Sequence, residues 1–123
     1  MTSKLEMRTT YPAIVGQVLA NRRSALKVKQ AKMAKALNVG QSAWSRVETG
    51  QTALNIEQLR TIALELKSTP DDLLAEADRV EKYLRGRGMN VVPHEEGKQS
   101  DLATALIVGA ALGLLLATVF SRK

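Results

Sequence analysis

Four polar residues that could contact nucleic-acid bases fall on one face of a helix predicted over residues 41–48: Gln41, Ser42, Ser45 and Arg46. The opposite face of this helix carries the apolar residues Trp44 and Val47. A glutamine side chain can form two hydrogen bonds with adenine, and an arginine side chain can do the same with guanine. The spacing and the residue types indicate a short helix with one face packed inward and the other able to contact base edges.

The chain lacks the residue sets on which most enzyme chemistry depends. It contains no cysteine, which excludes disulfides, thiolate zinc sites and cysteine nucleophiles. Its single histidine, His94, lies in a polar stretch and is predicted to be a solvated linker residue. The sequence has no paired carboxylates, nucleophile–base set, phosphate-binding loop or metal-ligand cluster. We therefore expect no catalytic activity, no metal and no cofactor.

Positive charge is concentrated in the first half of the chain. The formal net charge is +6, yet residues 1–52 alone hold nine basic and two acidic side chains. Residues 53–89 hold six basic and seven acidic side chains. This asymmetry is typical of a surface that faces a polyanion, and ordinary solvated helix faces are the alternative.

Helical periodicity and local signals place five helices before residue 86. Pro12 suits the first turn of the first helix, and the second covers about residues 30–37. Asn38 and Gly40 tolerate the left-handed backbone, so residues 38–40 are predicted to turn sharply into the helix over 41–48.

The last two helices have clear starting signals. Asn55 and Gln58 have the spacing of a capping box, and Thr69 followed by Pro70 supplies a cap and a first-turn proline. No segment predicts a strand long enough to build a sheet, so the fold class is all-α. The predicted organisation is a tail over 1–11, a five-helix domain over 12–85, a linker over 86–101, an apolar helix over 102–120 and a short tail over 121–123.

The segment QAKMAKALNVGQSAWSRVETG, residues 30–50, resembles the helix-turn-helix of the Cro/phage-repressor (XRE-type) family. The similarity extends over about residues 15–74. It rests on Gln30 opening the second helix, on Ala34 between the two helices, and on the Glu-x-Gly that ends the third. The resemblance implies a five-helix, lambda-repressor-like DNA-binding domain whose partner is double-stranded DNA.

The resemblance also implies roles for single residues. Gln30 would donate to a DNA phosphate, while Gln41 and Arg46 would contact base edges, with Ser42 and Ser45 facing the groove beside them. The lysines of this region would attract phosphates without regard to sequence: Lys27, Lys29, Lys32 and Lys35.

Two further expectations concern structure rather than DNA contact. Arg23 and Glu48 match a pair that forms an internal salt bridge between the first and third helices in the family. Lys29 stands where the family usually has a serine or threonine cap, so we expect the second helix to be poorly capped.

The apolar run LATALIVGAALGLLLATVF, residues 102–120, predicts one membrane-spanning helix. Its nineteen residues hold no charge, and a helix of this length extends roughly 28 Å, close to the thickness of a hydrocarbon core. We expect a single-pass protein of the inner membrane, in contact with lipid, whose N-terminal domain lies in the cytoplasm. The pair Arg122 and Lys123 does not support this orientation by local charge bias.

Small residues recur every four positions in this run: Ala105, Gly109, Gly113 and Ala117. Such a stripe lets two helix backbones approach closely, which favours a homodimer within the membrane. Chance occurrence in an alanine- and glycine-rich span is the alternative.

Taken together, the sequence predicts a membrane-anchored, sequence-specific DNA-binding transcriptional regulator. One alternative is a membrane-tethered adaptor, similar to the bacterial cytoskeletal protein RodZ, that uses the helix-turn-helix domain for protein contacts. Another is a basic surface that binds anionic lipid headgroups beside the anchor.

Overall fold

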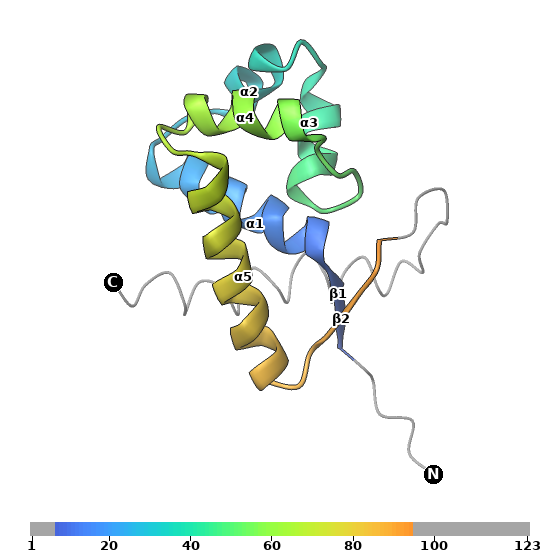
Figure 1. The fold of residues 1–123 in the computed structure, drawn as a ribbon. Helices are drawn as coiled ribbons and strands as arrows, with labels where there is room; N and C mark the ends of the chain where they lie inside the picture. The colour runs from blue at the N-terminus through green and yellow to red at the C-terminus, as the bar shows by residue number, and fades with distance from the viewer. Residues whose placement is uncertain (1–6, 95–123) are drawn as a thin grey trace.

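The computed structural model describes residues 7–94, which form a mostly helical domain (Figure 1). In chain order its elements are β1 (Arg8–Thr10), α1 (Tyr11–Ala25), α2 (Gln30–Ala36), α3 (Gln41–Glu48), α4 (Ile56–Glu65), α5 (Pro70–Gly86) and β2 (Asn90–Val92). The apolar run over 102–120, its stripe of small residues and the end of the predicted linker lie outside the described residues. Between residues 7 and 94, no helix combines the length and apolarity needed to span a membrane.

Side-chain caps fix the starts of three helices. The Thr10 hydroxyl accepts from the backbone N–H of Ala13 at the start of α1, and Thr69 plays the same part for α5. Asn55 and Gln58 form the predicted capping box at the start of α4. In contrast, Lys29 makes no side-chain cap for α2, so this helix depends on tertiary packing for its stability.

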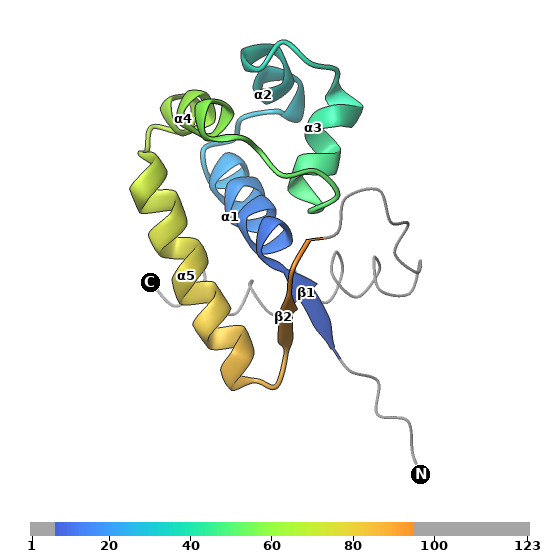
Figure 2. The same ribbon diagram turned by 45° about the vertical axis from the view of Figure 1, so that its right-hand side comes forward.

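Helix α1 lies in the middle of the domain. It packs against α5 along one side and against α3 on another, while α2 and α3 pack closely together at one end (Figures 1 and 2). The largest fully buried side chains are Trp44, Ile14, Leu19, Met33, Ile62, Leu66, Leu73 and Leu84. Aliphatic side chains from all five helices thus form one core around a single tryptophan.

The fifth helix buries an apolar stripe against the rest of the domain. Leu73, Ala77, Val80 and Leu84 are each 1% exposed or less. Burial of this stripe inside one domain leaves it unable to pair with a second copy of the chain. Any dimer that involves the described residues must therefore use another surface.

The strand pair corrects the expectation of an all-α fold without a sheet. Arg8–Thr10 pairs in parallel with Asn90–Val92, so part of the predicted tail and part of the predicted linker belong to the folded domain. Thr9 is 0% exposed and Met89, just before β2, is 2% exposed. The signal was missed because each strand has three residues and the partners are about eighty positions apart, which leaves no local alternation to detect.

Candidate nucleic-acid interface

Helix α3 has one buried face and one exposed face. Trp44, Val47 and Glu48 are buried, at 0%, 7% and 8% exposure. Gln41, Ser42 and Arg46 are exposed and Ser45 is half-buried. The predicted base-contacting side chains therefore share one side of the helix, and the domain leaves Gln41, Ser42 and Arg46 uncovered and Ser45 partly covered.

A tight turn sets the direction of α3 relative to α2. Asn38 has a φ of 58°, which is the left-handed conformation that asparagine tolerates better than most residues. The backbone N–H of Val39 returns to the carbonyl of Ala34 at 3.0 Å. Ala34 is 3% exposed and α2 packs closely against α3, which agrees with the position that the resemblance implies for this small side chain.

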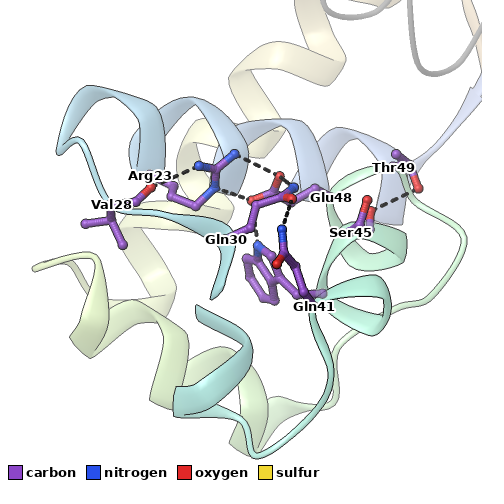
Figure 3. A network of polar contacts seen from close by, with 8 residues as sticks. Arg23, Val28, Gln30, Gln41, Ser45, Glu48 and Thr49 are labelled. Atoms are coloured by element: carbon purple, nitrogen blue, oxygen red, sulfur yellow. Dashed lines mark hydrogen bonds and ion pairs between the residues drawn. The ribbon is translucent and has the colours of Figure 1, made fainter. Parts of the chain in front are cut away.

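The Glu48 carboxylate accepts hydrogen bonds from three other side chains (Figure 3). Arg23 approaches it with two nitrogens, Nε at 2.6 Å from Oε2 and Nη2 at 3.1 Å from Oε1. Gln30 Nε2 lies 2.7 Å from Oε1, and the indole nitrogen of Trp44 lies 2.6 Å from Oε2. We call these four residues, Arg23, Gln30, Trp44 and Glu48, the Glu48 network.

The Glu48 network joins three helices. Arg23 comes from α1, Gln30 from α2, and Trp44 with Glu48 from α3. Arg23 also donates to the backbone carbonyl of Val28 at 2.9 Å, which ties the α1–α2 loop to the same point. A buried carboxylate with several charge-assisted bonds has one favourable geometry, so the network fixes the orientation of α3 on the domain.

The Arg23–Glu48 ion pair implied by the family resemblance is thus present, and Trp44 adds a bond that sequence reasoning missed. Trp44 was predicted only to pack, and it is fully buried. Its indole N–H also needs an acceptor when buried, and Glu48 stands four residues later on the same helix face. That i, i+4 spacing is the signal that could have revealed the bond.

Gln30 links the Glu48 network to the exposed face of α3. Its amide nitrogen donates to Glu48, and its amide oxygen accepts from Gln41 Nε2 at 3.4 Å. An amide nitrogen carries two hydrogens, so one hydrogen of Gln30 is left beyond the bond to Glu48. The same side chain can therefore orient Gln41 and still donate to a phosphate.

The C-terminal end of α3 approaches α1 at a glycine. A Cβ atom on Gly16 would lie 2.3 Å from the carbonyl oxygen of Val47 and 2.7 Å from that of Glu48. Gly50, just after α3, has a φ of 84°, and a Cβ there would meet Ala13 at 2.5 Å. These two glycines allow the contact between backbones that places α3.

The surface around α2 and α3 is strongly basic. Lys29 and Lys32, predicted to attract phosphates, are exposed at the start of α2, and Lys27 and Lys35 are exposed nearby. Among residues 7–52, Glu48 is the one acidic side chain, and it is buried against Arg23. The exposed charged side chains of residues 7–52, which include α2 and α3, are therefore all basic. Residues 7–94 place no group of three His, Cys, Asp or Glu side chains where a metal ion could be held.

Two helices joined by a tight turn, with the second presenting polar side chains outward, define a helix-turn-helix domain. A family model described as "Helix-turn-helix domain" matches residues 14–77, just over half of the chain. The chain belongs to this family.

Comparison with solved structures gives the same fold. One crystal structure of the clp gene regulator ClgR from Corynebacterium glutamicum has a TM-score of 0.60 and 22% identity, over 63% of this chain and 82% of that chain. A second crystal structure of ClgR has a TM-score of 0.53 and 25% identity, over 56% of this chain and 90% of that chain. No curated protein matches the sequence.

Proposed function

We propose that the protein is a transcriptional regulator of the XRE type that binds double-stranded DNA through α3. The observation that carries this proposal is the arrangement of α3. Gln41 and Arg46 are exposed on one side, while the Glu48 network holds the other side to α1 and α2. A recognition helix needs both properties, because base contacts require side chains that reach outward from a fixed backbone.

The proposed division of labour follows the chemistry of the side chains. Arg46 and Gln41 contact base edges in the major groove, with Ser42 and Ser45 beside them. Gln30, Lys29 and Lys32 contact or attract phosphates and so contribute affinity without sequence preference. The family match and the likeness to a named gene regulator support this proposal.

Arg46→Ala tests the proposal directly. Sites bound in the genome by the full chain are mapped for the wild type, for Arg46→Ala and for Arg79→Ala, which removes an exposed arginine from α5. Loss of one bidentate base contact costs about 1–3 kcal/mol, so specific sites should weaken roughly 5- to 150-fold. Residual binding should remain and should fall steeply with salt.

The control separates base contact from general charge. Arg79→Ala should leave the map unchanged, because α5 packs against α1 and lies away from α3 (Figures 1 and 2). Identical maps for the wild type and Arg46→Ala would overturn the assignment of α3. Absence of any bound sites, together with capture of a defined protein partner, would favour the adaptor function instead.

We further propose that residues 102–120 anchor the regulator in the inner membrane as a homodimer, with the DNA-binding domain in the cytoplasm. Support comes from the uncharged run and from its stripe of small residues. Paired domains would bind two half-sites, and tethering would raise their local concentration.

Carbonate extraction of membranes should retain the wild type and release Leu112→Arg. In a separate measurement, Gly109→Ile with Gly113→Ile should weaken self-association. Extraction of the wild type would contradict the anchor.

A further inference from the structure

A basin of about 610 Å³ lies where the loop after α1, the first turn of α2 and the end of α4 meet. Its lining includes four lysines and a single carboxylate: Lys27, Lys29, Lys32, Lys67 and Glu65. Leu26 and Val28 give it an apolar part. The ends of α1 and α4 lie side by side in Figures 1 and 2. The basin is distinct from the exposed face of α3 but shares Lys29 and Lys32 with the DNA-facing surface proposed above.

Arg22 holds two walls of this basin together. Its Nε and Nη2 donate to the backbone carbonyls of Leu66 and Lys67, each at 3.3 Å. These carbonyls belong to the end of α4, where the helix leaves its last acceptors unpaired and favours a cation. The positions of Lys27 and Lys67 relative to each other are therefore set by a side chain that is not itself part of the lining.

The four basin lysines have no carboxylate partner within the described part of the chain. Ion pairs found there, such as Arg23 with Glu48 and Arg85 with Glu81, do not involve these lysines. Four ammonium groups beside one glutamate leave an excess of positive charge around a concave surface. Such a surface attracts anions, and lysine binds phosphate as a compact point charge.

The backbone at two of these lysines adds an independent observation. Lys27 has a φ of 59° and Lys67 a φ of 54°, both in the left-handed region that glycine and asparagine adopt more easily. Three non-glycine residues of the described domain have this conformation, and two of them line this one basin. Both lysines also follow the C-terminal end of a helix, where a positive charge is favourable, and the left-handed backbone places both of them at the same basin.

We propose that this basin binds a small molecule that carries two or more phosphate groups. The lysines contact the phosphates, and Leu26 with Val28 contacts an apolar part of the ligand. An occupied basin neutralises Lys29 and Lys32 and thereby weakens attraction to DNA, a coupling that rests on the proposed DNA-binding function. By linkage, bound DNA weakens ligand binding by the same factor.

Isothermal titration calorimetry of the purified full chain tests the binding step. The probes are inorganic pyrophosphate and adenosine triphosphate, with inorganic sulfate at matched ionic strength as the reference anion. The variant is Lys27→Asn with Lys67→Asn, which removes two charges and suits the left-handed backbone. We expect it to bind both probes at least tenfold more weakly than the wild type and to melt at an equal or higher temperature.

Matched controls remove the same charge elsewhere. Lys35→Asn on α2 and Lys82→Asn on α5 lie outside the basin and should change probe binding less than twofold. Equal weakening by all variants would show a general charge effect and would overturn the proposal. A second result would also overturn it: neither probe binds the wild type, whereas micelles containing phosphatidylglycerol bind the wild type and do not bind the variant at Lys27 and Lys67.

The coupling to DNA is measured separately, with a fragment taken from a mapped site. Adenosine triphosphate should weaken DNA binding by the wild type severalfold more than sulfate of equal ionic strength, and this difference should vanish in the double variant. If the double variant binds DNA tenfold more weakly than the wild type without any ligand, and Lys35→Asn with Lys82→Asn does not, the basin contacts DNA directly and the proposed coupling through a ligand is wrong. Failure of the chain to bind DNA would overturn the proposed function but leave the calorimetric test intact.

Discussion

Helices α3 and α5 both bury apolar side chains in the core, but they differ in how polar contacts join them to the rest of the domain. Helix α5 has seventeen residues, a threonine cap and an apolar stripe that packs against the domain. Helix α3 has eight residues and no side-chain cap, and a buried carboxylate fixes it through bonds from α1 and α2. Apolar burial contributes stability but little direction, whereas charged hydrogen bonds require one geometry. The helix that must present side chains at fixed positions is the one held by polar contacts.

The largest expected difference between the two helices is in the unfolding free energy lost when one carboxylate is removed, Glu48 from α3 or Glu81 from α5. Glu48→Ala leaves the partly buried Arg23 without its ion-pair partner and the buried indole of Trp44 without an acceptor. Breaking a buried pair on one side costs about 3–5 kcal/mol of unfolding free energy. Glu81→Ala on α5 removes an i, i+4 pair with Arg85 whose side chains are 26% and 53% exposed. We expect that change to cost no more than about 0.5 kcal/mol.

Urea denaturation followed by Trp44 fluorescence measures both variants, since Trp44 is the sole tryptophan of the chain. The indole emission should also change in folded Glu48→Ala, because its hydrogen-bond acceptor is gone. Similar losses of unfolding free energy in Glu48→Ala and Glu81→Ala would show that polar contacts matter no more for α3 than for α5.

A second prediction concerns the contact between α1 and the end of α3. Gly16→Ala places a methyl group against the carbonyl oxygens of Val47 and Glu48, which belong to the backbone and cannot rotate away. Overpacking of this kind costs about 1–3 kcal/mol, and α3 should shift as well. Thermal unfolding monitored by circular dichroism gives the stability, and specific DNA affinity reports the shift.

Gly86→Ala on α5 is the matched control for this change. A Cβ there meets nothing within 4 Å, and alanine favours helix over glycine. The melting temperature should stay the same or rise slightly. A variant at Gly16 that keeps both its stability and its DNA affinity would show that the close approach does not position α3.

The helices could be predicted from the sequence because their signals are local. The capping box at Asn55, the proline at position 70 and the turn at Asn38 each act within a few residues. The exposed face of α3 followed from its periodicity alone. The ion pair that joins α3 to Arg23 could be predicted only from the family resemblance, because residues twenty-five positions apart leave no local pattern.

Features made by distant residues were not predictable in this way. The strand pair joins Thr9 to Val91, and the basin brings Lys67 beside Lys27. Both depend on how α1 lies against α4 and α5, which sequence periodicity does not specify. The bond from Gln30 to Glu48 likewise requires the packed positions of two helices. Local signals therefore predict the helices, whereas the polar contacts that orient them depend on how the helices pack.

The last prediction concerns a polar contact between α1 and α5. The Tyr11 hydroxyl donates to Asp78 Oδ1 at 2.6 Å, which joins the start of α1 to α5. Burial of the ring and this bond to Asp78 raise the pKa of Tyr11 above its ordinary value. Tyr11→Phe should cost about 1 kcal/mol at pH 7, the net contribution of a typical hydrogen bond, because this bond is exposed to solvent.

The pH dependence distinguishes this bond from simple packing. Because the pKa of Tyr11 is raised in the folded state, its stabilisation is complete below the unfolded pKa of about 10 and declines as the pH rises above that value. The stability difference between the wild type and Tyr11→Phe should therefore shrink above about pH 10 in denaturation curves. No difference between the two proteins at any pH would mean that the ring, which Tyr11→Phe retains, and not the hydroxyl, joins α1 to α5. In that case α5 would be held by apolar contacts alone, and its contrast with α3 would be sharper still.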